Sequence, residues 1–197
     1  MIVGIEEIQL KRLPCLAHSI QLSVSKGLEI SSRLTEKCRK IVGHFKHSSL
    51  ATSSLQSWQK RLQLPEHRLI QDVVTRWNST LDMIERLLEQ RLAISAALHS
   101  ANNTAASMEL SSTDWEHLNG LVPILKPFKL ATEAMSGESY VSSSLTLPCV
   151  FQLVNETKEM EEKSKGMLKN TCRAILNDLQ SRYPINNMPD EYAFASL

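Results

Sequence analysis

Apolar residues recur every three or four positions along most of this chain, and that spacing constrains the fold more than any other feature. Between residues 34 and 45 one such series would line a single face of a helix, while most of the lysines and arginines of that stretch fall on other faces. The apolar series consists of Leu34, Cys38, Ile41, Val42 and Phe45. Glycine, which weakens helix interiors, occurs only 6 times in 197 residues. We therefore predict a mainly α fold.

The same periodicity predicts where the helices begin and end. They are expected at residues 14–28, 32–46, 49–64, 78–98, 113–137, 148–163 and 167–183. Thr113 and Glu116 form the pattern of a capping box at the start of the fifth helix, and Pro123 and Pro127 predict a kink or a break inside it. Residues 99–112 are polar and are predicted to form a loop or linker.

One segment departs from the helical pattern. Residues 68–75 contain a Leu-Ile-x-x-Val-Val series, and β-branched side chains favour extended backbone. We predict one short strand or an extended segment there, between two helical regions.

Composition excludes some classes of protein. No run of about 18 apolar residues is present, and the N-terminus lacks an apolar block behind basic residues, so neither a membrane span nor a secretory signal is indicated. The four cysteines, at positions 15, 38, 149 and 172, are widely spaced and are expected to be free thiols. Residues 1–76 hold 12 Lys and Arg against 6 Asp and Glu, whereas residues 77–197 hold 10 against 15. The first part is the better candidate for contact with an anionic partner, although solvated helix faces can differ in this way by chance.

Cys15 and His18 are spaced to lie near each other on a helix. With His44 and His47 they could supply four zinc ligands, and as a nucleophile and base they could form a thiol hydrolase. Neither spacing matches a recognisable module, so the favoured reading of the residues is a buried cysteine beside a hydrogen-bonded histidine. We predict no metal site and no cofactor.

Arg76 and Trp77 stand side by side where the predicted strand gives way to a helix. A guanidinium pairs with phosphate and an indole stacks on a base, which together suit the binding of single-stranded or distorted nucleic acid. Residue types alone favour the alternative, in which Trp77 anchors the core and Arg76 forms a salt bridge with Asp72.

Three motifs in order resemble those of a known family. They are residues 14–22 (PCLAHSIQL), 45–48 (FKHS) and 72–87 (DVVTRWNSTLDMIERL). The chain resembles the hAT superfamily of DNA transposases, and above all their domesticated zinc-finger BED-type relatives. The resemblance implies an RNase H-like catalytic domain interrupted by an all-helical insertion domain, with an Asp, Asp, Glu triad that binds divalent metal. It also implies that Cys15 and His18 organise the active site and that Arg76 and Trp77 contact DNA.

The resemblance places the catalytic carboxylates outside this chain, the second Asp just before Met1 and the Glu well after Leu197. Residues 1–76 would then be a remnant of the RNase H-like region with the first helices, and residues 77–197 a helical insertion domain truncated at its C-terminus. A BED zinc finger and a C-terminal dimerisation region would also lie outside. We therefore expect a catalytically inactive, transposase-derived fragment of a nuclear DNA-binding regulator, with DNA as a candidate partner. The alternatives are a helical protein-interaction scaffold, in the nucleus or cytoplasm, and a partial gene product without a function of its own.

Overall fold

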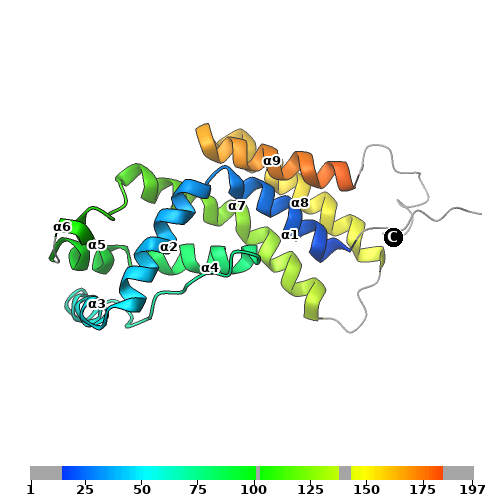
Figure 1. Ribbon diagram of the computed structural model, residues 1–197. Coiled ribbons are helices and arrows are strands. Elements are labelled where there is room, and N and C mark those ends of the chain that lie inside the picture. Colours follow the sequence, from blue (N-terminus) through cyan, green and yellow to red (C-terminus); the bar gives the residue numbers. More distant parts are fainter. Residues whose placement is uncertain (1–14, 101–102, 138–142, 184–197) are drawn as a thin grey trace, which may run out of the picture.

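The computed structural model describes residues 15–100, 103–137 and 143–183, and every regular element in these ranges is a helix (Figure 1). The elements are α1 (Leu16–Glu29), α2 (Ser32–His47), α3 (Ser49–Arg61), α4 (Trp77–Glu89), α5 (Arg91–Ser100), α6 (Asn103–Ala106), α7 (Ser112–Gly137), α8 (Ser143–Lys163) and α9 (Gly166–Arg182). The mainly α prediction is confirmed. None of these helices is long and apolar enough to cross a membrane.

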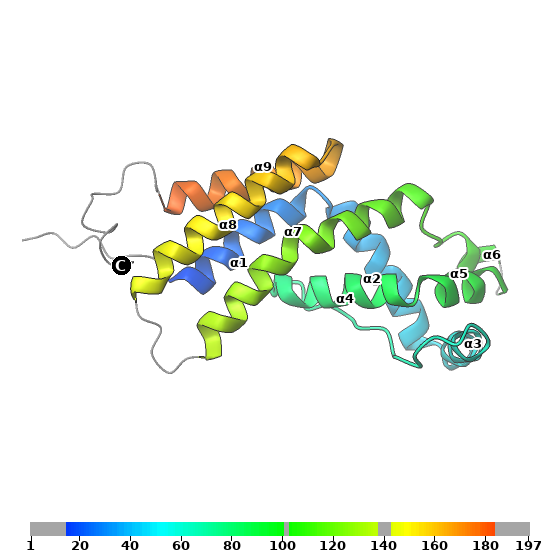
Figure 2. The same ribbon diagram turned by 180° about the vertical axis from the view of Figure 1, so that it is seen from behind.

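The helices form an elongated molecule with two ends joined by α7 (Figures 1 and 2). At one end α1 packs against α7 and α9, and α8 packs against α9. At the other end α2 and α5 both pack against α3, and α4 packs against α7. The division of the chain into residues 1–76 and 77–197 stays a prediction, and α1 from the first part has its main contacts with helices of the second.

The predicted apolar faces form the core. Four apolar residues of the α2 series are fully buried or nearly so, and α4 buries an equivalent face of its own. These are Cys38, Ile41, Val42 and Phe45 on α2, with Leu81, Ile84 and Leu87 on α4. All belong to one continuous cluster of buried side chains that reaches α7 and α9. Burial of each such side chain contributes about 1.5 to 3 kcal/mol relative to exposure.

The predicted strand at residues 68–75 is wrong. These residues run without regular structure from α3 to the start of α4, and Val73 and Val74 are exposed. Preference for extended backbone makes a strand only where a second strand offers its hydrogen-bonding groups, and the ranges described contain no strand. The RNase H-like sheet implied by the resemblance is likewise not part of these ranges.

The single helix predicted at residues 78–98 is two helices, α4 and α5, that meet at Gln90. The backbone of Gln90 leaves the helical region (φ −98°, ψ 9°), and its side chain is buried. Its amide donates to the carbonyl of Pro65 at 3.0 Å and accepts from the Gln59 amide at 2.9 Å. Contacts with distant residues therefore interrupt a helix that the local sequence would continue. The predicted loop at 99–112 also contains the short α6.

The prolines do not break the helices, so of the kink or break predicted at Pro123 and Pro127 the break is wrong and the kink stays a prediction. Pro123 and Pro127 both lie inside the continuous α7, and α8 begins five residues before Pro148. The capping box of α7 lies two residues earlier than predicted: the Ser111 hydroxyl accepts from the Asp114 amide at 3.1 Å, and the Asp114 carboxylate accepts from the Ser111 amide at 3.2 Å. Aspartate thus plays the role predicted for Glu116.

The close approach of α1 and α9 depends on Gly27. A methyl group added at Gly27 would lie 2.5 Å from a side-chain carbon of Ile175 and 3.2 Å from the backbone oxygen of Thr171. We expect Gly27→Ala to lower the free energy of unfolding by about 1 to 3 kcal/mol, because the two helices must move apart. Gly43→Ala is the matched control, since the nearest atom to its added methyl group lies 4.0 Å away. Urea denaturation should show that this control is neutral or up to about 1 kcal/mol more stable, and equal results for the two variants would contradict the packing argument.

Candidate nucleic-acid interface

Asp72 fixes the start of the DVVTRWNST segment. Its side chain is fully buried and accepts three hydrogen bonds from the Arg39 guanidinium of α2, at 2.8 to 3.0 Å. The Thr80 hydroxyl of α4 donates to the same carboxylate at 3.0 Å. One buried carboxylate in the segment between α3 and α4 therefore holds α2 and α4 together. Burial, the largest single effect, favours the neutral acid, but the hydrogen bonds and charge of Arg39 together with the hydrogen bonds from Thr80 and Gln71 outweigh it and hold the pKa of Asp72 below its ordinary value of 3.8.

Ser79 fixes the turn that follows. Its hydroxyl accepts from the Val73 amide at 2.8 Å and lies 2.7 Å from the carbonyl of Arg76, to which it can donate. The Arg76 amide in turn donates to the carbonyl of Val73 at 2.7 Å. The turn is closed by these bonds, and it presents Val74 (73% exposed) and Arg76 to solvent.

Trp77 lies at the first position of α4 and is only 2% exposed. In this conformation its ring belongs to the core, as the alternative reading of the residues proposed, and offers no face to a base. The ion pair between Arg76 and Asp72 in that reading is wrong, because Asp72 pairs with Arg39. The structure thus separates the two members of the motif, and only Arg76 is accessible to a ligand.

Cys15 and His18 lie at the N-terminal end of α1, and both are exposed. The expected buried pair is therefore wrong. Their assignment as residues that organise an active site stays a prediction from the resemblance. His44 and His47 lie near the far end of the next helix, and no group of three His, Cys, Asp or Glu side chains in the described residues could hold a metal ion.

The other cysteines are shielded. Cys38 and Cys172 are buried, and Cys149 is partly buried. Burial raises the pKa of Cys38 to about 12 and that of Cys172 to about 11. These thiols remain protonated near neutral pH and act as small apolar side chains.

The side of α2 that faces solvent carries a row of basic side chains. They recur at spacings of four, three, four and three, which places them along one stripe of the helix. The stripe consists of Arg33, Lys37, Lys40, His44 and His47, and we call it the α2 basic face. All five are exposed except His44, which is partly buried. At a rise of about 1.5 Å per residue the stripe is roughly 21 Å long.

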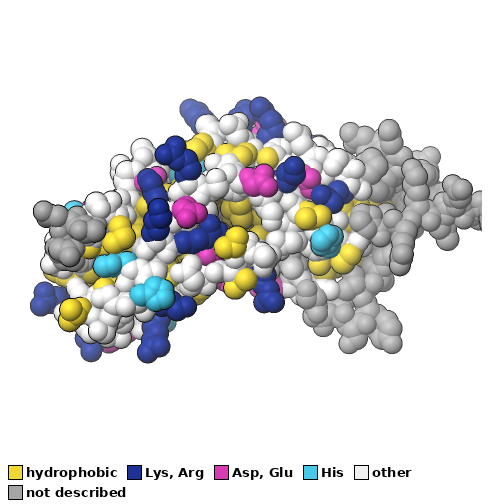
Figure 3. Space-filling model, viewed as in Figure 1, with side chains coloured by type: hydrophobic (Ala, Val, Ile, Leu, Met, Phe, Trp, Pro, Cys, Tyr) yellow, Lys and Arg dark blue, Asp and Glu magenta, His cyan; other side chains and the backbone are white. Residues whose placement is uncertain are grey.

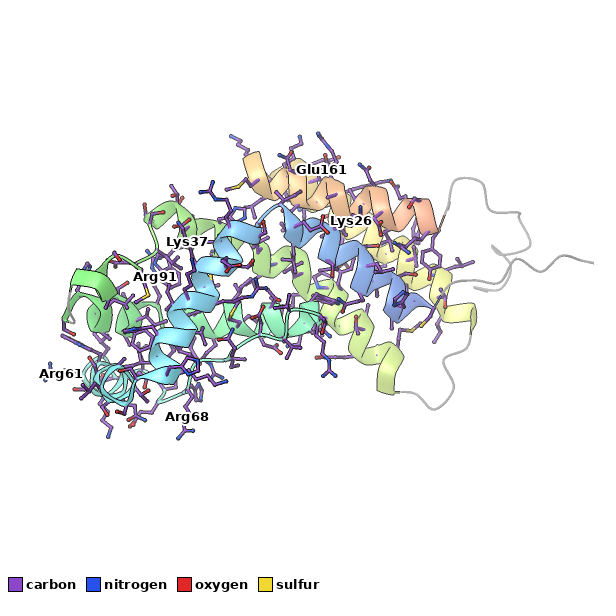
Figure 4. All side chains as sticks on the ribbon, viewed as in Figure 1. Lys26, Lys37, Arg61, Arg68, Arg91 and Glu161 are labelled. Carbon is purple, nitrogen blue, oxygen red and sulfur yellow. The ribbon has the colours of Figure 1, made fainter. Side chains whose placement is uncertain are left out.

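Acidic charge compensates part of the α2 basic face, because Glu36, three residues after Arg33 and four before Lys40, has a side chain that is 64% exposed. Lys37 forms an ion pair with Asp114 of α7 at 2.8 Å, whereas Arg33 and Lys40 have no acidic partner within the described ranges. Figure 3 shows blue and cyan side chains over α2 with acidic side chains among them, and Figure 4 places Lys37 on this helix. An excess of positive charge in the first 76 residues is evident in the sequence, but this stripe was not predicted from it. The regular spacing of its residues along α2 is the signal that could have located it.

Comparison with known proteins agrees with the resemblance of the motifs. Residues 13–123 match the model of the ZBED1 RNase-like helical domain. The chain is 31% identical over 188 residues to the human zinc finger BED domain-containing protein 4, and the matched region covers 93% of this chain and 16% of that protein. It is 29% identical over 156 residues to the human zinc finger BED domain-containing protein 6, covering 76% and 15% of the two chains. A Zea mays protein named "Putative AC transposase" is 29% identical over 175 residues, covering 88% of this chain and 22% of the maize protein.

The chain thus spans only about a sixth to a fifth of the length of these relatives. No solved structure is significantly similar to it.

Proposed function

The chain belongs to the ZBED1 RNase-like helical domain family of hAT transposase-derived BED zinc finger proteins, and from that premise we propose that it is a non-enzymatic, DNA-binding domain of a nuclear regulator. The observation that carries the proposal is the α2 basic face. The stripe is about 21 Å long and carries the cations Arg33, Lys37 and Lys40 in its first half, which suits contact with the phosphates of a duplex. Such contacts position a protein without reading the base sequence. Arg76, on the turn fixed by Asp72 and Ser79, adds one more exposed cation.

The absence of an enzyme activity is part of the proposal. Transposition by this family needs carboxylates that converge on divalent metal, and the described residues contain no such group. The names of the relatives, zinc finger BED domain-containing proteins, support a nuclear setting for this chain. Dimerisation through a region beyond this chain is proposed on the resemblance alone.

A helical scaffold for protein contacts is the second candidate. Leu130 on α7 and Leu145 on α8 are exposed, and α7 and α8 border a groove of about 340 Å³ whose floor includes Leu153. Exposed apolar residues beside a groove are typical of protein interaction sites. This candidate predicts no salt-sensitive DNA binding.

Removal of two cations from the α2 basic face should separate the candidates. For Arg33→Gln with Lys40→Gln we expect weaker binding to duplexes of any sequence, and a slope of log affinity against log salt concentration that is shallower by about 2, one unit for each lost phosphate contact. Fluorescence anisotropy with a labelled duplex, measured between low and physiological salt, gives both quantities.

The matched control removes two exposed lysines elsewhere. Lys158→Gln with Lys165→Gln changes the net charge by the same amount, and both side chains are exposed. The DNA-binding proposal expects this variant to keep the wild-type slope. Identical slopes for the two double variants, or no binding by the wild type, would contradict the proposal.

A further inference from the structure

A second cavity lies away from the α2 basic face, between the C-terminal half of α2, α3 and the extended segment that follows α3. Its volume is about 360 Å³, within the range of pockets that hold ligands in proteins. The floor is apolar and is made by Val42, Phe45 and Leu55, all of them buried, with Leu69 at one side. The site combines this floor with one buried polar group and a basic rim.

The polar group is the side-chain oxygen of Gln59. Gln59 is 1% exposed, and its amide nitrogen donates to the carbonyl of His67 and to the side-chain oxygen of Gln90, both at 2.9 Å. Its oxygen has no partner in the described structure. A buried acceptor left without a donor costs about 1 to 3 kcal/mol. Gln59 borders the cavity, so a ligand that moves this side chain enough to reach its shielded oxygen and supplies one N–H group would remove that cost.

The rim carries uncompensated positive charge. Lys46 and Arg68 both border the cavity and are exposed, and neither has an acidic partner within the ranges described. Glu66 also borders the cavity, but its carboxylate lies 3.6 Å from the Lys60 ammonium. His67 also borders the cavity, and its ring pairs with the Glu89 carboxylate at 3.0 Å. Figure 4 shows Arg68 at the edge of the molecule, beyond the helices.

The extended segment beside the cavity has open backbone groups. Leu69 and Ile70 make no backbone hydrogen bond to another described residue. An extended chain laid alongside could pair with these groups, as peptides do when they bind to an exposed strand edge.

We propose that this cavity binds an extended acidic peptide of a partner protein, with one aliphatic or aromatic side chain on the apolar floor. A peptide N–H supplies the single donor that Gln59 lacks, and acidic flanking residues match Lys46 and Arg68. An extruded nucleobase fits less well, because its several polar edge groups would be buried with one unpaired acceptor available to them. The inference is independent of DNA binding by the α2 basic face.

The test uses a fluorescein-labelled peptide with one phenylalanine between two pairs of glutamates, and anisotropy as the readout. We expect binding by the wild type, and a loss of about tenfold or more in affinity when the phenylalanine of the probe is replaced by alanine. Gln56→Trp places a bulky ring at the cavity, since Gln56 borders it and is exposed, and should abolish binding. Ser57→Trp is the matched control, because Ser57 is the exposed neighbour on the same helix and does not border the cavity.

Three outcomes would overturn the proposal. They are equal binding by Gln56→Trp and Ser57→Trp, equal binding of a probe whose glutamates are replaced by lysines, and displacement of the probe by a single-stranded oligonucleotide from the wild type and from Ser57→Trp alike. Circular dichroism of both variants shows whether each is folded. Duplex binding measured on the same samples reports on the α2 basic face separately, so failure here and failure of the DNA-binding proposal can be told apart.

Discussion

Replacement of Asp72 by alanine is expected to lower the free energy of unfolding by about 2 to 3 kcal/mol, because it leaves the hydrogen-bond donors of this carboxylate without an acceptor. Asp72 is fully buried, and its loss leaves the Arg39 guanidinium and the Thr80 hydroxyl without their acceptor. Removal of one partner of a fully buried pair costs about 3 to 5 kcal/mol, and the 25% exposure of the Arg39 side chain places this pair below that range. Urea denaturation followed by circular dichroism measures the loss.

Asp82→Ala is the matched control for burial. Asp82 also accepts a short hydrogen bond, from Lys129 at 2.6 Å, but its side chain is 38% exposed. An ion pair in contact with water contributes about 0 to 1 kcal/mol, so this variant should remain close to the wild type. Equal losses in the free energy of unfolding for Asp72→Ala and Asp82→Ala would contradict the expectation that burial makes the first ion pair more stabilising.

The same carboxylate gives a pH dependence. The pKa of Asp72 in the folded protein lies below its ordinary value of 3.8, so the unfolded chain binds the proton more readily. Its contribution to stability is therefore fully present above that ordinary value and is lost as the pH falls through the lower, folded pKa. The pKa values of Glu89, Asp114 and Asp178 are lowered too, so the wild type must be compared with Asp72→Asn. We expect the difference in stability between the two proteins to be constant near neutral pH and to shrink below about pH 4.

Helices were predictable because their pattern is local. The buried face of α2 is the face that its own sequence indicates, and the boundary between α2 and α3 was predicted within two residues. The divided helix at Gln90 was not predictable in this way, since the bonds that hold Gln90 come from Gln59 and Pro65, some 25 to 31 residues away. Local pattern reports propensity, and such contacts override it.

In the candidate site, too, some features follow from local sequence and others depend on contacts between distant residues. The α2 basic face was not among the predicted site residues, although the spacing of its residues along one helix could have located it. The partner of Asp72 does not, because Arg39 lies 33 residues earlier and the sequence offered Arg76 as a nearer choice. The peptide cavity needs α2, α3 and the segment after α3 together, so no single stretch of sequence indicates it.

Trp77→Ala is expected to be among the most destabilising single substitutions in the chain, with a loss of about 3 to 5 kcal/mol in the free energy of unfolding. Trp77 is 2% exposed and belongs to the same core cluster as Leu81 and Ile84 of its own helix. Arg76→Ala should change stability by no more than about 0.5 kcal/mol, because the Arg76 side chain is exposed. Thermal and urea unfolding of the two variants measures this contrast between adjacent residues.

For DNA binding we expect the opposite ranking: substitution of Arg76 should have a larger effect than substitution of Trp77. Trp77→Phe keeps most of the buried apolar volume and should leave the affinity of the folded protein for a labelled duplex nearly unchanged, whereas Arg76→Ala should weaken binding and lower the salt slope by about 1. A stable Trp77→Phe protein that loses binding as strongly as Arg76→Ala would show that the indole reaches DNA after a rearrangement that exposes it. If instead the two effects separate as expected, the tryptophan of the motif holds the turn in place, and the arginine on that turn is the group that meets the phosphate.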